Sequence, residues 1–168
     1  MNTTAAAPDL SPLISPRVIR WGSIFLLTVL VVAFVRRVAS GEPYFPTVHG
    51  LWLILHLATV IPAIPLGAYV LLHRKGDARH KLLGRVWAFL MLATALSSFG
   101  LTGLTGNYSP IHLLSILVLI SLPRAIWDAR RGRIARHRRT MTILYASLVV
   151  AGLFTFLPGR LFGIWLFG

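Results

Sequence analysis

The chain has 168 residues, of which 56% are hydrophobic and 12% are charged, against about 25% charged in ordinary globular proteins. Because so few charged residues cannot cover a surface that faces water, the composition excludes an ordinary soluble domain and predicts an all-α integral membrane protein in contact with the lipid bilayer. The chain has no Cys, which excludes disulfides, thiolate metal sites and the attachment motif of c-type haem.

The first 18 residues are expected to be a cytoplasmic tail, because they are rich in proline and have little apolar pattern. The apolar run 19–38 that follows fits either an uncleaved signal-anchor helix or a cleaved signal peptide. Arg36 and Arg37 stand between the apolar run and a possible cleavage point after residue 40, and this placement favours the signal anchor.

Four more apolar segments follow, each close to the roughly 17 to 25 residues that a helix needs to cross the hydrocarbon of a bilayer. Together with the first helix they predict five transmembrane helices, and helices two to five are expected to form a four-helix bundle over residues 49–157. The C-terminal residues 158–168 are expected at the outer surface. The four segments cover residues 49–72, 86–104, 111–127 and 141–157.

The formal net charge of +13 is concentrated at a few places. Twelve of the 17 Lys and Arg lie in two stretches, 74–85 and 124–139, and Arg17 and Arg20 fall on the same predicted side. The positive-inside rule therefore predicts a cytoplasmic N-terminus and an external C-terminus in a bacterial inner membrane, with no nucleic-acid binding. Aromatic residues at the predicted interfaces are Trp52, Tyr44, Tyr108 and Trp165 on the outer side and Trp87 and Trp127 on the inner side.

One helical hairpin occurs twice in the sequence. His56 is followed after 24 residues by His80 and His112 after 25 residues by His137, and each second His ends an Ala-Arg-His triplet. A repeat of two helices returns the chain to the same side, so the copies are predicted to be parallel. His56 and His112 should then share a depth in the outer half, and His80 and His137 should share the inner boundary. The copies cover residues 49–104 and 111–157.

Histidines inside lipid are rare and usually functional, because the imidazole loses its hydrogen bonds to water. Two neutral imidazoles at one depth on opposite helices satisfy the axial ligation of haem iron. The sequence therefore predicts a b-type cytochrome-like electron-transfer protein with one or two haem b. The ligands would be His56 with His112 and His80 with His137. A quinol or a respiratory redox protein is the expected partner. Side chains placed to neutralise haem propionates are Arg79, Arg85, Arg136 and Arg139.

A second interpretation stays open, in which the protein is a non-catalytic accessory or assembly subunit or a small transporter. His56 and His112 would then bind neighbouring helices through hydrogen bonds, or a metal ion without haem, and His80 and His137 would be solvated. His49 and His73 are alternative ligands on either side of His56. A homo-oligomer fits both interpretations, because the first helix lies outside the repeat.

Four segments of the chain closely resemble a bacterial family of predicted membrane proteins, domain of unknown function 2306. They are HKLLGRVW at 80–87, IHLLS at 111–115, HRRTM at 137–141 and FLPGR at 156–160. This resemblance brings no established activity. The arrangement also looks like the cytochrome b-561 type, which implies two haems held by His pairs on alternate helices. His80 and His137 depart from that type, because they are predicted just before their helices and not inside them.

Overall fold

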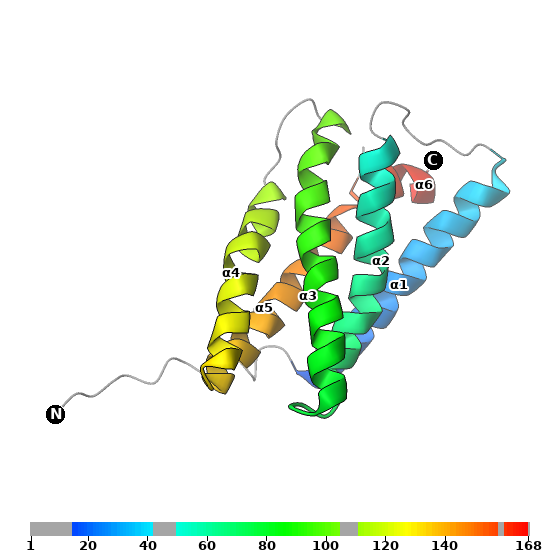
Figure 1. Ribbon diagram of the computed structural model, residues 1–168. Coiled ribbons are helices and arrows are strands. Elements are labelled where there is room, and N and C mark those ends of the chain that lie inside the picture. Colours follow the sequence, from blue (N-terminus) through cyan, green and yellow to red (C-terminus); the bar gives the residue numbers. More distant parts are fainter. Residues whose placement is uncertain (1–14, 42–49, 105–110, 158–159, 168) are drawn as a thin grey trace.

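The structure is a computed structural model that describes residues 15–41, 50–104, 111–157 and 160–167 (Figure 1). All regular secondary structure in these ranges is helical, which confirms the predicted all-α class. The helices are α1 (Pro16–Ala39), α2 (Gly50–Leu72), α3 (Ala78–Ser98), a 3-10 helix η2 (Phe99–Leu104), α4 (His112–Arg130), α5 (Ile134–Phe154) and α6 (Leu161–Phe167).

Four helices in the described ranges are long and apolar enough to cross a membrane. They are α1, α2, α4 and the continuous helix Ala78–Leu101, which joins α3 to the start of η2. The helix α5 is not among them, because Arg136, Arg138 and Arg139 lie near its beginning and lower its hydropathy. The fifth transmembrane helix therefore stays a prediction.

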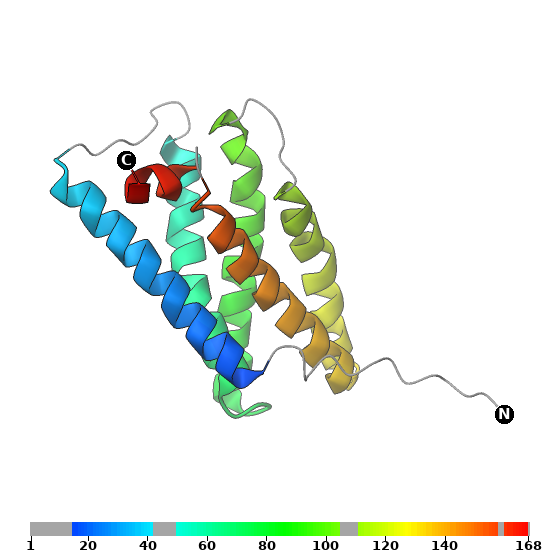
Figure 2. The same cartoon turned by 180° about the vertical axis from the view of Figure 1, so that it is seen from behind.

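The long helices pack in a closed ring, with α2 against α3, α3 against α4, α4 against α5 and α5 against α2. Consequently α2 and α4 face each other across one diagonal, and α3 and α5 across the other (Figure 1). The helix α1 leans across α2 and α5, and α6 packs against α1 (Figure 2).

The two ends of the bundle differ in charge. The start of α1 and the α2–α3 and α4–α5 connections lie at one end, which carries the basic stretches 74–85 and 124–139 and is called the basic end below (Figure 1). The opposite end, where α4 begins and α5 finishes, is called the far end. The charge asymmetry found in the sequence thus separates the two ends of the bundle.

Two helices begin earlier than the apolar segments suggested. The Asp77 side chain accepts a hydrogen bond from the backbone N–H of His80 at 2.7 Å, so it caps the start of α3. His80 therefore lies in the first turn of α3, and His137 lies in the first turn of α5. The prediction that these histidines precede their helices was wrong, because hydropathy marks where lipid ends and a helix can continue beyond that boundary.

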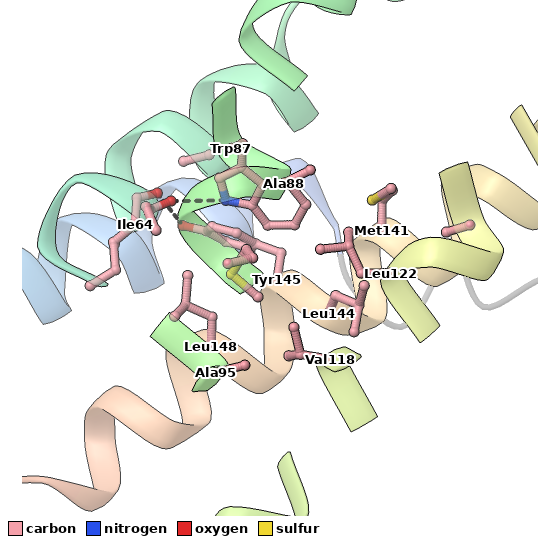
Figure 3. Close-up of a cluster of buried hydrophobic side chains, with 14 of the residues drawn as sticks. Ile64, Trp87, Ala88, Ala95, Val118, Leu122, Met141, Leu144, Tyr145 and Leu148 are labelled. Carbon is pink, nitrogen blue, oxygen red and sulfur yellow. Dashed lines mark hydrogen bonds between the residues drawn. The ribbon is translucent and has the colours of Figure 1, made fainter. Parts of the chain in front are cut away.

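The core of the bundle is centred on Trp87 and Tyr145 (Figure 3). The Trp87 indole N–H donates to the Ala63 carbonyl at 3.0 Å, and the Trp87 side chain is 2% exposed. Trp87 is therefore a core residue, and its expected place among the interfacial aromatics was wrong. Gly67 provides the reason, because its missing Cβ leaves the space on α2 that Trp87 fills.

At the far end, Trp165 of α6 is also buried, in a cluster with Phe162, Leu53 and Ala33. Its side chain therefore faces the protein, while its depth near the outer interface stays a prediction. By contrast, Trp127 is 56% exposed near the basic end, with the guanidinium of Arg131 over its ring at 4.4 Å.

Candidate cofactor site

His56 and His112 line the same cavity, which lies inside the ring of helices toward the far end and has a volume of about 190 Å³. His56 comes from α2 and His112 from the first residue of α4, so the two rings approach from diagonal helices. The remaining walls come from α3, from α5 and its connection to α6, and from Leu30 of α1, Leu101 of η2 and Phe162 of α6. Most lining residues are apolar, and the polar ones besides the histidines are Thr94, Ser98, Ser115, Ser147, Thr155 and Arg160.

The ring of His56 is held in one orientation by α3. Its Nδ1 lies 3.1 Å from the carbonyl oxygen of Thr94 and 3.1 Å from Oγ of Ser97. Because a carbonyl oxygen can only accept, Nδ1 carries the proton and donates to Thr94. In the neutral ring the Nε2 atom then holds the lone pair, and this is the arrangement in which a histidine binds a metal through Nε2.

The ring of His112 has the opposite arrangement. Its Nε2 atom donates to the carbonyl oxygen of Ser98 at 3.2 Å, so the lone pair of the neutral ring lies on Nδ1. The ring also packs at a tilt against Phe99, with 5.8 Å between ring centroids, and His112 is 8% exposed. Ligation through Nε2 would require this ring to turn away from Ser98.

Hydroxyl side chains surround the two histidines and were missed by the sequence interpretation. Thr94 donates to the hydroxyl of Thr59 on α2 at 3.0 Å, and the hydroxyls of Ser98 and Ser115 lie 2.7 Å apart between α3 and α4. A signal was present in the sequence, because Thr94, Ser97 and Ser98 recur at helical spacing within an apolar segment. Such residues commonly join helices inside a membrane.

The second histidine pair lies at the basic end. His137 donates from Nδ1 to the Ala125 carbonyl at 2.9 Å, whereas the buried Nδ1 of His80 has no hydrogen-bond partner within the described ranges. His80 and His137 lie within electrostatic range of each other. A small cavity of about 120 Å³ beside His80 is not lined by His137. Its other polar lining residues are Tyr69, His73, Arg74, Asp77 and Arg79.

The four arginines expected at haem propionates all lie toward the basic end, and none of them lines the cavity between His56 and His112. Arg79 is exposed and donates to the Tyr69 hydroxyl at 3.5 Å. Arg136 approaches Asp128 at 4.0 Å, and Arg85 is exposed. The arginine that does line this cavity is Arg160, which sequence reasoning did not select as a binding residue.

The alternative ligands are not placed to replace His56. His73 is exposed and stacks on Tyr69 with 3.8 Å between ring centroids, and His49 lies outside the described residues. Within the described ranges, no group of three or more His, Cys, Asp or Glu side chains could hold a metal ion. A centre with two protein ligands is the arrangement that the histidine pairs offer.

Helices of this length and apolarity, packed around a histidine-lined cavity, define an all-helical membrane protein with an internal binding site. The chain belongs to the family described as predicted membrane protein (DUF2306), whose model matches residues 53–163. That range includes both cavity histidines and Arg160. No curated protein and no solved structure matches the chain, so the likeness to the cytochrome b-561 type stays an expectation.

Proposed function

We propose that the protein is a membrane-bound b-type cytochrome-like electron carrier that holds haem b between His56 and His112. The observation that supports this most directly is that imidazoles from two diagonal helices line one cavity. In a bundle, opposed histidines on facing helices are a common way to hold a cofactor. The walls are mostly apolar, as the body of a porphyrin requires, but the cavity of about 190 Å³ is smaller than a haem, so the surrounding helices would have to separate to admit one.

The donor atoms of the site fit a haem with two imidazole ligands. His56 already directs its proton to Thr94 and keeps the lone pair on Nε2. His112 could serve as the second ligand through Nε2 only if its ring turned away from the Ser98 carbonyl. Haem iron with both axial positions filled exchanges single electrons and does not bind oxygen.

The contribution of the chain is to hold and orient the ligands. The hydrogen bond from His56 to the Thr94 carbonyl fixes the ring and makes its Nε2 more basic. The residues that line the cavity are mostly apolar, so they would give a bound haem a largely apolar environment. Both effects favour a rigid centre whose surroundings change little during electron transfer.

A second haem between His80 and His137 is part of the proposal. Its support is that both histidines lie in the first turns of diagonal helices at the basic end. Arg79, Arg85, Arg136 and Arg139 lie at this end of the bundle and would neutralise propionates. The haem-to-protein ratio decides between one haem and two.

The membrane arrangement that accompanies this function has five spans, with the basic end in the cytoplasm of a bacterial inner membrane. The charge asymmetry between the two ends supports this orientation. Electrons would enter from a quinol or from a redox partner protein. The exposed apolar side chains of α1 suit contact with lipid or with a second copy of the chain.

The test is an absorption spectrum of protein produced in haem-sufficient cells and purified in mild detergent. We expect a Soret band, and sharp α and β bands on reduction with dithionite. His56→Ala and His112→Ala should remove the bands of this site, whereas the exposed His73→Ala serves as the matched control and should leave them unchanged. A colourless wild-type preparation would contradict the proposal and favour an accessory subunit or transporter.

A further inference from the structure

The cavity between His56 and His112 has the size of one substituted aromatic ring. Its volume is about 190 Å³, and most of its lining residues are apolar. An apolar cavity of about 150 Å³ inside a protein is large enough to hold benzene. The cavity therefore accommodates a six-membered ring with a few substituents at its present size, without the separation of helices that a haem would require.

His56 projects into this cavity from the inward face of α2. Leu53, Val60 and Ile64 share that face, because they stand three residues before and four and eight residues after it, and they also line the cavity. The His56 Nδ1 donates to the Thr94 carbonyl, so the lone pair lies on Nε2. This Nε2 has no hydrogen-bond partner among the described residues, and protein atoms do not enclose it. His56 thus offers a hydrogen-bond acceptor to a molecule in the cavity.

The hydroxyl groups of the described cavity wall use their protons within the protein. Ser98 donates to the Ala95 carbonyl at 2.7 Å, which leaves Ser115 to donate to the Ser98 oxygen at 2.7 Å. The remaining three hydroxyls, of Thr94, Ser147 and Thr155, donate to Thr59, Leu144 and Gly152. A ligand that needs a hydroxyl donor from this wall would have to break one of these bonds.

These contacts select a ligand that donates a hydrogen bond. His112 also uses its N–H on a protein carbonyl, that of Ser98, so the hydroxyls and imidazoles of the wall leave an acceptor at His56 and no donor. A quinol carries O–H donors on a single aromatic ring, whereas the corresponding quinone carries only acceptors. We infer that the cavity binds the head group of a quinol, whose hydroxyl donates to Nε2 of His56.

This inference rests on the quinol partner of the proposed function and gives that partner a binding site. The quinol and a haem between His56 and His112 exclude each other, because both need the same space. A haem bound at the same time as the quinol would lie at the basic end, between His80 and His137. The quinol site can therefore be tested on protein that contains no haem.

The experiment compares decylubiquinol with decylubiquinone, which differ in the two hydroxyl protons. Full-length protein made in haem-deficient cells is titrated with each compound under anaerobic conditions in mild detergent, and binding is measured by calorimetry. We expect the quinol to bind roughly threefold to tenfold more tightly, because it alone forms the hydrogen bond to His56. Equal binding of the two compounds, or a preference for the quinone, would overturn the inference.

A histidine variant locates the preference. His56→Phe keeps an aromatic ring and removes Nε2, so it should bind quinol and quinone equally. His73→Phe is the matched control, because His73 is exposed, stacks on Tyr69 and does not line this cavity, and it should retain the preference. A His56→Phe protein that still prefers the quinol would place the acceptor elsewhere and overturn the inference.

A second pair of compounds separates the hydrogen bond from the redox state and uses the wild-type chain alone. The probes are 4-propylphenol and its methyl ether, of which the phenol alone has a donor, and the phenol should bind more tightly. Wild-type protein that binds neither pair would overturn the quinol site and leave the haem proposal to its absorption spectrum. Protein that prefers quinol and phenol but shows no haem bands would support this site and contradict the haem proposal.

Discussion

The hydroxyl of Tyr145 on α5 donates a hydrogen bond of 3.1 Å to the carbonyl oxygen of Ile64 on α2. The same hydroxyl forms a hydrogen bond with the hydroxyl of Ser23 on α1. One buried side chain therefore joins α5 to two helices, α1 and α2, that lie far from it in the sequence, and Figure 3 shows its bond to Ile64. Trp87 binds the neighbouring carbonyl of Ala63, so α3 reaches α2 at the same level.

Gly67→Ala should destabilise the bundle. A Cβ at this position would meet the indole nitrogen of Trp87 and would lie 2.7 Å from Cδ2 of Tyr145, so both rings would have to move. Overpacking of a core typically costs about 1–3 kcal/mol. Thermal unfolding in detergent measures the change. Gly84→Ala on α3 is the matched control, since a Cβ added there would have nothing within 4 Å and a helical alanine should be neutral or stabilising.

Tyr145→Phe should lower the free energy of unfolding by about 1–3 kcal/mol, because it removes two buried hydrogen bonds that are worth about 0.5–1.5 kcal/mol each. The ring would still fill the core, while the links to Ile64 and to Ser23 would be lost. Tyr69→Phe is the control with a smaller expected effect, because the Tyr69 hydroxyl interacts only weakly, with Arg79 at 3.5 Å. Equal effects of the two substitutions would argue against Tyr145 as a joint between helices.

Ser97→Ala should weaken haem binding by less than about tenfold, below the usual range for losing the only outer partner of a ligating histidine. The reason is that His56 would keep its hydrogen bond to the Thr94 carbonyl after the Ser97 hydroxyl is lost. Haem titration at the Soret band gives the affinity. Ser147→Ala is the control, because Ser147 lines the cavity but donates to Leu144 in its own helix. A loss as complete as that of His56→Ala would show that Thr94 does not hold the ring.

Single cysteines test the membrane orientation, since the natural chain contains none. Lys75→Cys and Arg131→Cys place an exposed thiol at the basic end, and Ser40→Cys places one at the far end. With the basic end in the cytoplasm, a membrane-impermeant maleimide should label residue 40 in intact cells. Residues 75 and 131 should be labelled only after the membrane is permeabilised. The reverse pattern would invert the proposed topology.

The sequence alone determined the helical class, the approximate position of the membrane segments and the concentration of charge at one end. These properties follow from hydropathy and charge along the chain, which are local and need no knowledge of neighbours. Even so, the starts of α3 and α5 were placed too late, because His80 and His137 belong to helical turns that extend past the apolar run.

Only the tertiary structure decided which groups meet. The acceptor for His56 Nδ1 is the carbonyl of Thr94, 38 residues away, and Arg160 reaches a cavity whose histidines lie on two other helices. Trp87 entered the core because Gly67 opens α2 opposite to it. Such contacts depend on how each helix is rotated and tilted against its neighbours, and the pattern of residues along one helix does not contain that information.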